Sequence, residues 1–102
     1  MEKVQDVMKA PTKALKLLLE NERVRVLDVR LRPGEREPMH NHPSNHVIYV
    51  VSDAKFKLTS PDGKANQMDL KAGQTIWMDA GSHATENVGS TDGHLLVVEV
   101  KK

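Results

Sequence analysis

The stretch "HVIYVVSDAKFKLTSPDG", residues 46–63, favours β-structure over helix. Residues 46–52 are rich in β-branched side chains and almost continuously apolar, which is typical of a strand buried on both faces. In residues 55–60 polar and apolar side chains alternate, as on a strand with one buried face. The "PDG" at 61–63 then predicts a turn. This stretch therefore predicts two successive strands.

Short runs of the same kind continue on both sides of that stretch. Downstream, "NQMDL", "QTIWM", "SHATENV" and "HLLVVEV" are separated by turns or loops that contain glycine. Upstream, "RVRVLDVRL" at 23–31 alternates, but its apolar phase slips by one between Val26 and Leu27, which predicts a bulge. We count about eight short strands and no convincing helix after residue 20, and we predict an all-β sandwich or barrel.

The N-terminal part of the chain is less regular. Residues 1–14 are polar and predict a loose leader or a short helical turn, so we assign the folded domain to residues 15–102. Residues 14–19, "ALKLLL", allow either an amphipathic helical turn or a strand that enters a hairpin at the following "EN". This run is too apolar for a free arm, and we expect it to be buried in a homodimer.

Composition excludes several classes of protein. The chain has 102 residues, which is enough for one domain. The absence of cysteine excludes disulfides, thiolate catalysis and Cys-based zinc sites. The 15 Lys and Arg alternate with 14 Asp and Glu, so no basic surface for nucleic acid is expected. We expect no membrane span and no secretion signal, and therefore a cytoplasmic protein.

Three of the five histidines lie within the segment "PGEREPMHNHPSNHV", residues 33–47. His40 and His42 are two apart, so on an extended strand their side chains share a face, and two such imidazoles can chelate one ion. His46 follows with the same parity. His83, just after the turn at 79–81, is the candidate third ligand, whereas His94 adjoins a loop and indicates a solvent-facing strand end. The alternative is that these histidines are polar strand residues that merely cluster.

Two segments resemble the motifs of the cupin family. "PGEREPMHNH" resembles the first motif, a glycine, five residues and His-x-His, and "GQTIWMDAGSHATEN" resembles the second. The matching positions are Gly34, His40, His42, Gly73, Gly81, His83 and Asn87. The resemblance covers residues 20–100. It implies a small single-domain β-barrel, the double-stranded β-helix or jelly roll, with one divalent metal ion in its interior.

The sequence departs from the family pattern at several positions. His46 stands where the first motif normally has a glutamate, Asp79 replaces a proline, and Asp53 replaces a glycine. One residue, rather than two, separates Gly81 from His83. The expected site is therefore the three matched histidines, with His46 as a possible fourth ligand. Such an all-imidazole site favours Fe, Zn, Ni or Cu over Mn.

Other residues are candidates for a pocket beside the metal. They are Met39, Tyr49, Trp77, Met78, Glu86 and Asn87. The methionines and the tryptophan are also natural core-filling residues. Glu37, Glu86 and Tyr49 are the candidate acid/base groups, although a flanking exposed charge is the simpler explanation for the two glutamates.

Three classes of function follow. The first is a metal-dependent enzyme, dioxygenase-like or an isomerase, that acts on an unidentified small molecule. The second is a non-catalytic module or sensor that binds a small ligand or the metal. The third is a structural dimer with a vestigial site. Fold alone cannot choose among them, because one barrel supports many chemistries.

Overall fold

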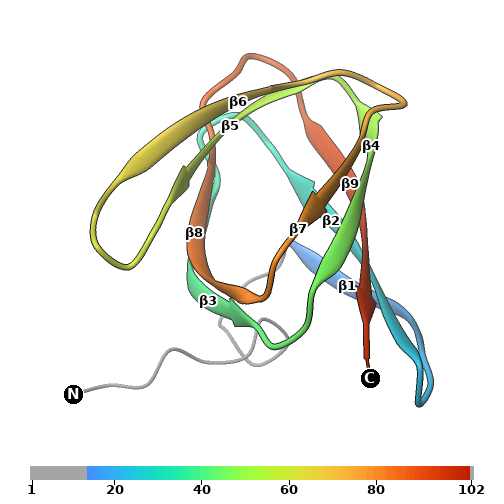
Figure 1. Cartoon of the computed structure of the whole chain (residues 1–102). Helices are drawn as coiled ribbons and strands as arrows, with labels where there is room; N and C mark the ends of the chain where they lie inside the picture. Colours follow the sequence, from blue (N-terminus) through green and yellow to red (C-terminus); the bar gives the residue numbers. More distant parts are fainter. Residues whose placement is uncertain (1–13, 102) are drawn as a thin grey trace.

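A computed structural model describes residues 14–101, which form nine strands in two antiparallel sheets (Figure 1). The strands are β1 Leu15–Glu20, β2 Val24–Leu31, β3 Arg36–His42, β4 His46–Ser52, β5 Ala54–Thr59, β6 Ala65–Leu70, β7 Thr75–Met78, β8 Gly81–Asn87 and β9 Gly93–Val100. One sheet has the order β1-β2-β9-β4-β7 and the other β3-β8-β5-β6. Apart from Ala14, the predicted leader lies outside the described residues. No helix that could cross a membrane occurs in residues 14–101.

The two sheets enclose one core. Alternate residues of β2, β4 and β9 point inward and meet residues of β5 and β6 from the other sheet, as the period of two requires. The buried apolar residues are Leu27, Val29, Leu31, Ile48, Val50, Ala54, Phe56, Leu70, Leu95 and Val97. The predicted all-β double-stranded β-helix is therefore confirmed.

The segment "LKLLLE" is a strand, so the helical-turn alternative is wrong. It pairs antiparallel with β2, which supplies the ninth strand where we expected about eight. The predicted bulge at Val26–Leu27 lies in the partner strand: the register shifts between Leu17 and Leu19, opposite those two residues. Strand β2 itself pairs with β9 without a shift.

The apparent phase slip in β2 has another cause. Arg25, Leu27, Val29 and Leu31 all point inward, although the first of them is charged. Val24 and Val26 consequently face outward, and the apolar pattern misled the sequence-based interpretation. Burying the charge of an arginine costs free energy unless a partner of opposite charge is buried beside it.

Two glycines of the recognised motifs occupy the third position of tight turns. Gly34 has φ of 85° in the turn closed by Glu35 N–H donating to Arg32 C=O, and Gly73 has φ of 89° in the turn closed by Gln74 N–H donating to Lys71 C=O. A positive φ at this position favours glycine. The first turn leads into β3 and the second into β7, so each glycine precedes a strand that borders the histidine cluster.

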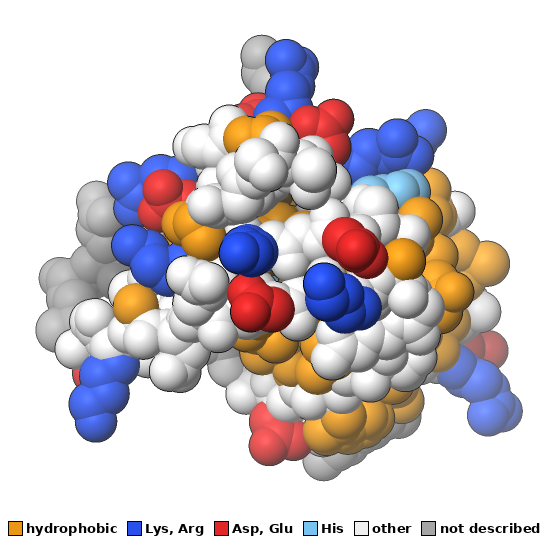
Figure 2. Space-filling model, turned by 90° about the horizontal axis from the view of Figure 1, so that it is seen from above, with side chains coloured by type: hydrophobic (Ala, Val, Ile, Leu, Met, Phe, Trp, Pro, Cys, Tyr) orange, Lys and Arg blue, Asp and Glu red, His pale blue; other side chains and the backbone are white. Residues whose placement is uncertain are grey.

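The outer face of the five-stranded sheet is unusually apolar. Val47 and Trp77 are direct neighbours on β4 and β7, and Trp77 is 57% exposed. At the opposite edge, Leu18 and Leu19 of β1 are each 49% exposed. Figure 2 shows hydrophobic side chains gathered along the right-hand side, where β4 and β9 lie in Figure 1, whereas charges of both signs intermingle elsewhere on that view. Such an apolar surface is typical of an interaction site.

The homodimer expected from the sequence stays a prediction, and the two edges of this sheet allow it to be located. Leu18→Glu on β1 and Trp77→Glu on β7 each place a charge on an exposed apolar edge, so neither should unfold the monomer. We expect light scattering to show a dimer of the wild-type chain at micromolar concentration and a monomer of Leu18→Glu. A dimer lost in Trp77→Glu alone would move the interface to the β7 edge.

Val88→Glu is the matched control, because Val88 is similarly exposed, at 41%, but follows β8 outside this sheet. It should leave the dimer intact. A wild-type chain that is monomeric at micromolar concentration contradicts the prediction altogether.

Candidate metal centre

The structure brings His40, His42 and His83 together. His40 on β3 is the direct cross-strand partner of His83 on β8, and His42 lies two residues further along the same face. The ring centroids are 4.7 Å apart for His40 and His83, and 5.0 Å apart for each of the other two pairs. One ligand atom from each ring lies within 4.8 Å of the others. Residues from both motifs therefore converge on one point.

A bulge in β3 aims the site inward. The pairing of β3 with β8 shifts between Glu37 and His40, so Pro38 and Met39 together face one residue of β8. Without this extra residue, positions three apart would point to opposite faces, but Glu37 and His40 are both buried. Proline is common at bulges because it cannot donate to the ladder.

Hydrogen bonds set the tautomer of three rings. Nδ1 of His40 donates to the Pro38 carbonyl at 2.8 Å, and Nδ1 of His46 donates to the Ser44 carbonyl at 3.0 Å. Nδ1 of His42 contacts the Glu99 carboxylate at 2.7 Å. Because these oxygens only accept, the proton lies on Nδ1 and Nε2 keeps its lone pair. That is the form in which an imidazole binds a metal.

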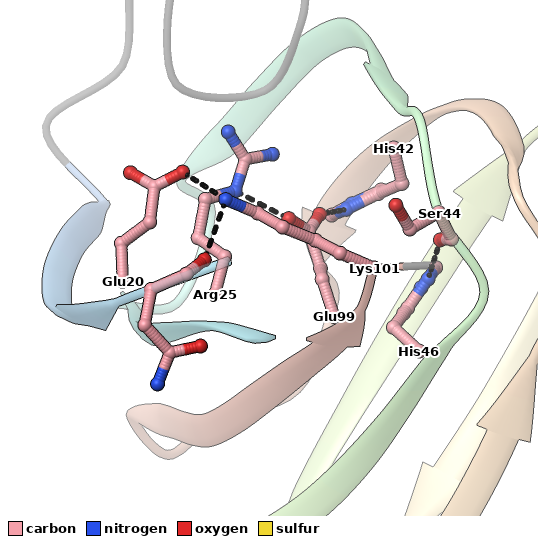
Figure 3. Close-up of polar contacts among 8 residues, drawn as sticks. Glu20, Arg25, His42, Ser44, His46, Glu99 and Lys101 are labelled. Carbon is pink, nitrogen blue, oxygen red and sulfur yellow. Dashed lines mark hydrogen bonds and ion pairs between the residues drawn. The ribbon is translucent and has the colours of Figure 1, made fainter. Parts of the chain in front are cut away.

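A buried ion pair supports His42. Glu99 on β9 is 1% exposed, and its two carboxylate oxygens contact the Arg25 guanidinium and His42 (Figure 3). Burial raises the pKa of Glu99, but the hydrogen bonds from His42 and Arg25 outweigh it and hold that pKa below its usual value. The carboxylate is therefore ionised and orients the ring from the other sheet.

Burial keeps the imidazoles of His40 and His83 neutral. It lowers the pKa of His40 to about 4, and the neighbouring imidazoles add to that effect. It lowers the pKa of His83 to about 3, with His40, His42 and His46 contributing further. At neutral pH these rings are therefore unprotonated, so the donor set fits a divalent transition metal.

His46 reaches the same region from the opposite sheet. Its ring stacks on that of His42, with centroids 4.4 Å apart, and it is the cross-strand neighbour of Glu99. Burial lowers the pKa of His46, and its Nε2 atom is buried without a hydrogen-bond partner. It is not within the tight three-residue group, but an orphaned buried nitrogen beside that group fits a further ligand.

A small cavity adjoins the histidines. It leaves about 40 Å³ open to the centres of water-sized groups, enough for an ion and a few such groups. The four histidines, Glu37 and Thr85 are its polar lining. The rest is apolar: Leu15, Val29, Ile48, Phe56, Leu58, Met68, Leu70, Ile76, Met78, Leu95 and Val97.

Of the six predicted pocket residues, Met78 lines this cavity. Tyr49 and Trp77 do not: they are 45% and 57% exposed on the outer face, because their neighbours Ile48 and Met78 take the inward positions of β4 and β7. We predicted both as pocket residues, but strand alternation directs them to the surface.

Met39, Glu86 and Asn87 also lie outside the cavity lining. Met39 is half-buried within the bulge of β3, and Glu86 faces Lys57, with an N–O distance of 3.6 Å. Asn87 is fully buried, and its amide donates to the carbonyls of Leu31 and Thr91, so it stabilises the loop before β9. His94 forms a hydrogen bond with Asp28 and does not line the cavity, in agreement with its prediction as a residue outside the metal site.

Sequence reasoning missed Arg25 and Glu99, and it treated Glu37 as an exposed charge. Strand parity carried the signal for the first two. Arg25 has the parity of Leu27 and Val29, and Glu99 that of Leu95 and Val97, so both charges stood on core-facing positions. Glu37 is 4% exposed, and only the bulge of β3, which the sequence pattern hides, explains its inward direction.

The role of Glu99 leads to a first prediction for this centre. Glu99→Gln should lower the affinity for a divalent metal by roughly 10 to 100-fold, because the support of His42 is disturbed. It should also destabilise the metal-free protein by about 3 to 5 kcal/mol, the usual effect of breaking a buried ion pair. Metal titration and urea unfolding measure the two effects.

The double variant Arg25→Met/Glu99→Met separates the two effects. Replacing a buried ion pair by apolar residues is often nearly neutral for stability, yet His42 still loses its acceptor. We expect most of the stability to return while metal affinity stays low. Full metal affinity in both variants would show that Glu99 does not support the site.

Burial of Glu37 leads to a second prediction, on pH and stability. Burial raises the pKa of this carboxyl from 4.5 to about 7. Between these values the unfolded chain has lost the proton that the folded protein retains, so the wild type loses up to about 3 kcal/mol of stability as pH rises. Glu37→Gln cannot ionise, and it should therefore be more stable than wild type at pH 8 but not at pH 4.5.

Urea unfolding of metal-free wild type and Glu37→Gln at pH 4.5 and pH 8 checks this prediction. The lowered pKa values of His40 and His83 make stability fall as pH drops below about 6.5, but this effect is common to both proteins and cancels in the difference. Glu86→Gln, at the exposed Lys57 pair, should change stability by less than about 1 kcal/mol at either pH. If the free energies of unfolding of Glu37→Gln and wild type differ by the same amount at pH 4.5 and pH 8, the prediction is contradicted.

Solved structures share the fold over nearly the whole chain. A cupin domain from Bordetella pertussis Tohama I superposes with a TM-score of 0.80 at 22% identity, covering 100% of this chain and 99% of that one. An RmlC-like cupin family protein with a double-stranded β-helix fold from Methanocaldococcus jannaschii gives 0.70 at 23% identity, covering 99% and 92%. An uncharacterized conserved protein with a double-stranded β-helix domain from Klebsiella pneumoniae gives 0.69 at 20% identity, covering 98% and 90%.

At these identities the likeness shows the fold alone. No curated protein is similar enough to count as a match. The family is shown by the sequence itself, because the Cupin domain family model matches residues 27–99, most of the chain. The cluster of His40, His42 and His83 lies within the matched residues, and the chain belongs to the cupin family.

Proposed function

We propose that this cupin binds one divalent transition metal through His40, His42 and His83. The observation that carries the proposal is the convergence of these three rings, with ligand atoms within 4.8 Å of one another. The fixed tautomers of His40 and His42 and the neutral state of the buried rings support it. The all-imidazole donor set favours Fe, Zn, Ni or Cu over Mn.

His46 is the proposed fourth ligand. Its Nε2 atom is buried and has no hydrogen-bond partner, and its ring stacks on His42. A bound ion would satisfy this nitrogen, whose burial otherwise costs free energy. The residue thus takes the place of the carboxylate that the first cupin motif normally supplies.

For turnover, we propose an oxygenase-like reaction on a small molecule. A bound ion of this kind supplies Lewis-acid polarisation or activation of dioxygen. The chain's own residues restrict the ligand to a small one, because the cavity is about 40 Å³ and its walls are largely apolar. The buried carboxyl of Glu37 in this cavity supports a reaction, since it offers a group that can hold or release a proton.

The second candidate is a non-catalytic binding module or sensor. The apolar lining favours it, because most of the cavity wall offers no polar group to a reacting molecule.

A cytoplasmic location remains a proposal from the sequence.

Metal binding is tested with full-length protein purified without a metal-binding tag. After reloading with Fe, Zn, Ni, Cu or Mn in turn and desalting, we expect about one ion per chain, retained least well for Mn. His46→Ala should weaken binding by roughly 10 to 100-fold, whereas His46→Glu should shift the preference towards Mn. Elemental analysis and competition titration provide the measurements.

His94→Ala is the matched control, because His94 is bound to Asp28 rather than to the cluster. It should leave metal affinity unchanged. Folded wild-type protein that retains none of the five metals overturns the proposed function. Unchanged metal affinity and selectivity in both His46 variants would instead show that His46 is not a ligand and that three histidines bind the metal.

Oxygen uptake separates the enzyme from the binding module. The Fe-loaded protein is supplied with a panel of small hydroxy and keto acids, and the double variant His40→Ala/His42→Ala serves as the metal-deficient reference. Uptake above that of the reference supports an oxygenase. Full metal occupancy without uptake favours the binding module.

A further inference from the structure

Glu37 is the buried polar group that metal binding by the histidines does not use. Its side chain is 4% exposed, it lines the histidine cavity, and its Oε2 atom is buried without a hydrogen-bond partner. A buried carboxyl with an unsatisfied oxygen costs free energy in a purely structural role. This position in the cavity therefore requires an explanation beyond packing.

The described residues that line the cavity offer Glu37 no Lys or Arg to pair with. Among the described residues, the other titratable groups in the cavity lining are the four imidazoles, His40, His42, His46 and His83. The charged pair Arg25–Glu99 lies behind His42 and is already mutually satisfied. Thr85, directly opposite on β8, is the remaining polar lining residue, and all others are apolar.

Such surroundings favour the neutral acid. Burial alone raises the pKa of Glu37 to about 7, without a contribution from a neighbouring charge. A neutral carboxyl has one O–H donor, which an ionised carboxylate lacks. Below neutral pH the cavity therefore contains a hydrogen-bond donor for which the described residues provide no acceptor.

We propose that Glu37 donates a hydrogen bond from Oε2 to an oxygen of a small anionic ligand that occupies the histidine cavity. This inference rests on the proposed function, since the ligand would share the cavity with the bound metal. A divalent cation held by neutral imidazoles gives that cavity a positive charge, which favours an anion, and the anion offsets the effect of that charge on the Glu37 proton. The cavity volume of about 40 Å³ limits the anion to the size of a small carboxylate.

The test uses the full chain reloaded with Co²⁺, whose visible absorption reports changes around the ion, and formate as the probe. Titrations at pH 6 compare wild type, Glu37→Gln, Glu37→Met and Glu86→Gln. We expect Glu37→Met to raise the Kd of formate roughly 10-fold or more, because the donor is lost. Glu37→Gln keeps an N–H donor and should stay within a few-fold of wild type. Glu86→Gln, whose position lies outside the cavity, should bind as wild type does.

Two further readouts separate a ligand contact from a structural role. Between pH 6 and pH 8.5 the Kd of formate should rise more for the wild type than for Glu37→Gln. The reason is that the donor of Glu37 ionises over this range, whereas that of the glutamine does not. Infrared difference spectra should show the carbonyl band of a protonated carboxyl in wild type, shifted on addition of formate and absent in Glu37→Gln. These readouts remain available if Glu37→Met fails to fold.

The outcomes distinguish this inference from the proposed function. Wild-type protein that retains neither Co²⁺ nor any of the five metals named above overturns both. Protein that holds Co²⁺ but binds no formate, or binds it equally in wild type and Glu37→Met, overturns the role of Glu37 alone. The same holds if wild type and Glu37→Gln show the same change in affinity between pH 6 and pH 8.5, or if formate leaves the infrared band unmoved.

Discussion

The buried ion pair between Arg25 and Glu99 is the interaction on which the centre of this molecule depends. Both residues lie in the five-stranded sheet, yet Glu99 also binds His42 of the other sheet, so one carboxylate satisfies a buried cation and crosses the core. Burying either charge alone would be costly. The pairing of β2 with β9 places Arg25 directly opposite Glu99, and the same register that closes the sheet therefore supports the histidines.

The site is consequently held from two sides. The pairing of β3 with β8 brings His40 against His83, and the opposite sheet contributes Glu99 and His46. Hydrogen bonds through Nδ1 fix the rings of His40, His42 and His46, so little rearrangement is needed before an ion binds. A donor set on strands of two facing sheets is more rigid than one on loops, which suits the proposed binding of a transition metal.

Much of this could be predicted from the sequence, for physical reasons that differ from residue to residue. Alternation and turn residues predicted the strands, and the spacing of His40, His42 and His83 within two motifs predicted the cluster that the structure brings together. Glu37 could not be placed, because the β3 bulge inverts its direction and leaves no local trace in the apolar pattern. Tyr49 and Trp77, also predicted as pocket residues, lie on the outer face for a different reason: the parity of a strand residue decides its face. Arg25 was not recognised as a buried residue because its charge interrupts the apolar pattern of the inward-facing positions of β2.

The exchange of a glutamate for His46 changes the electrostatics of the whole cavity. In the usual motif a carboxylate beside the metal offsets one of its two charges. Here that position holds an imidazole whose pKa burial lowers, the carboxylate of Glu99 is already matched by Arg25, and burial shifts Glu37 towards its neutral form. A divalent ion bound by these residues would therefore keep nearly its full charge in a largely apolar cavity, where Coulomb attraction is strong. The replacement of the motif's glutamate by His46 is thus the feature that most directly favours an anionic ligand.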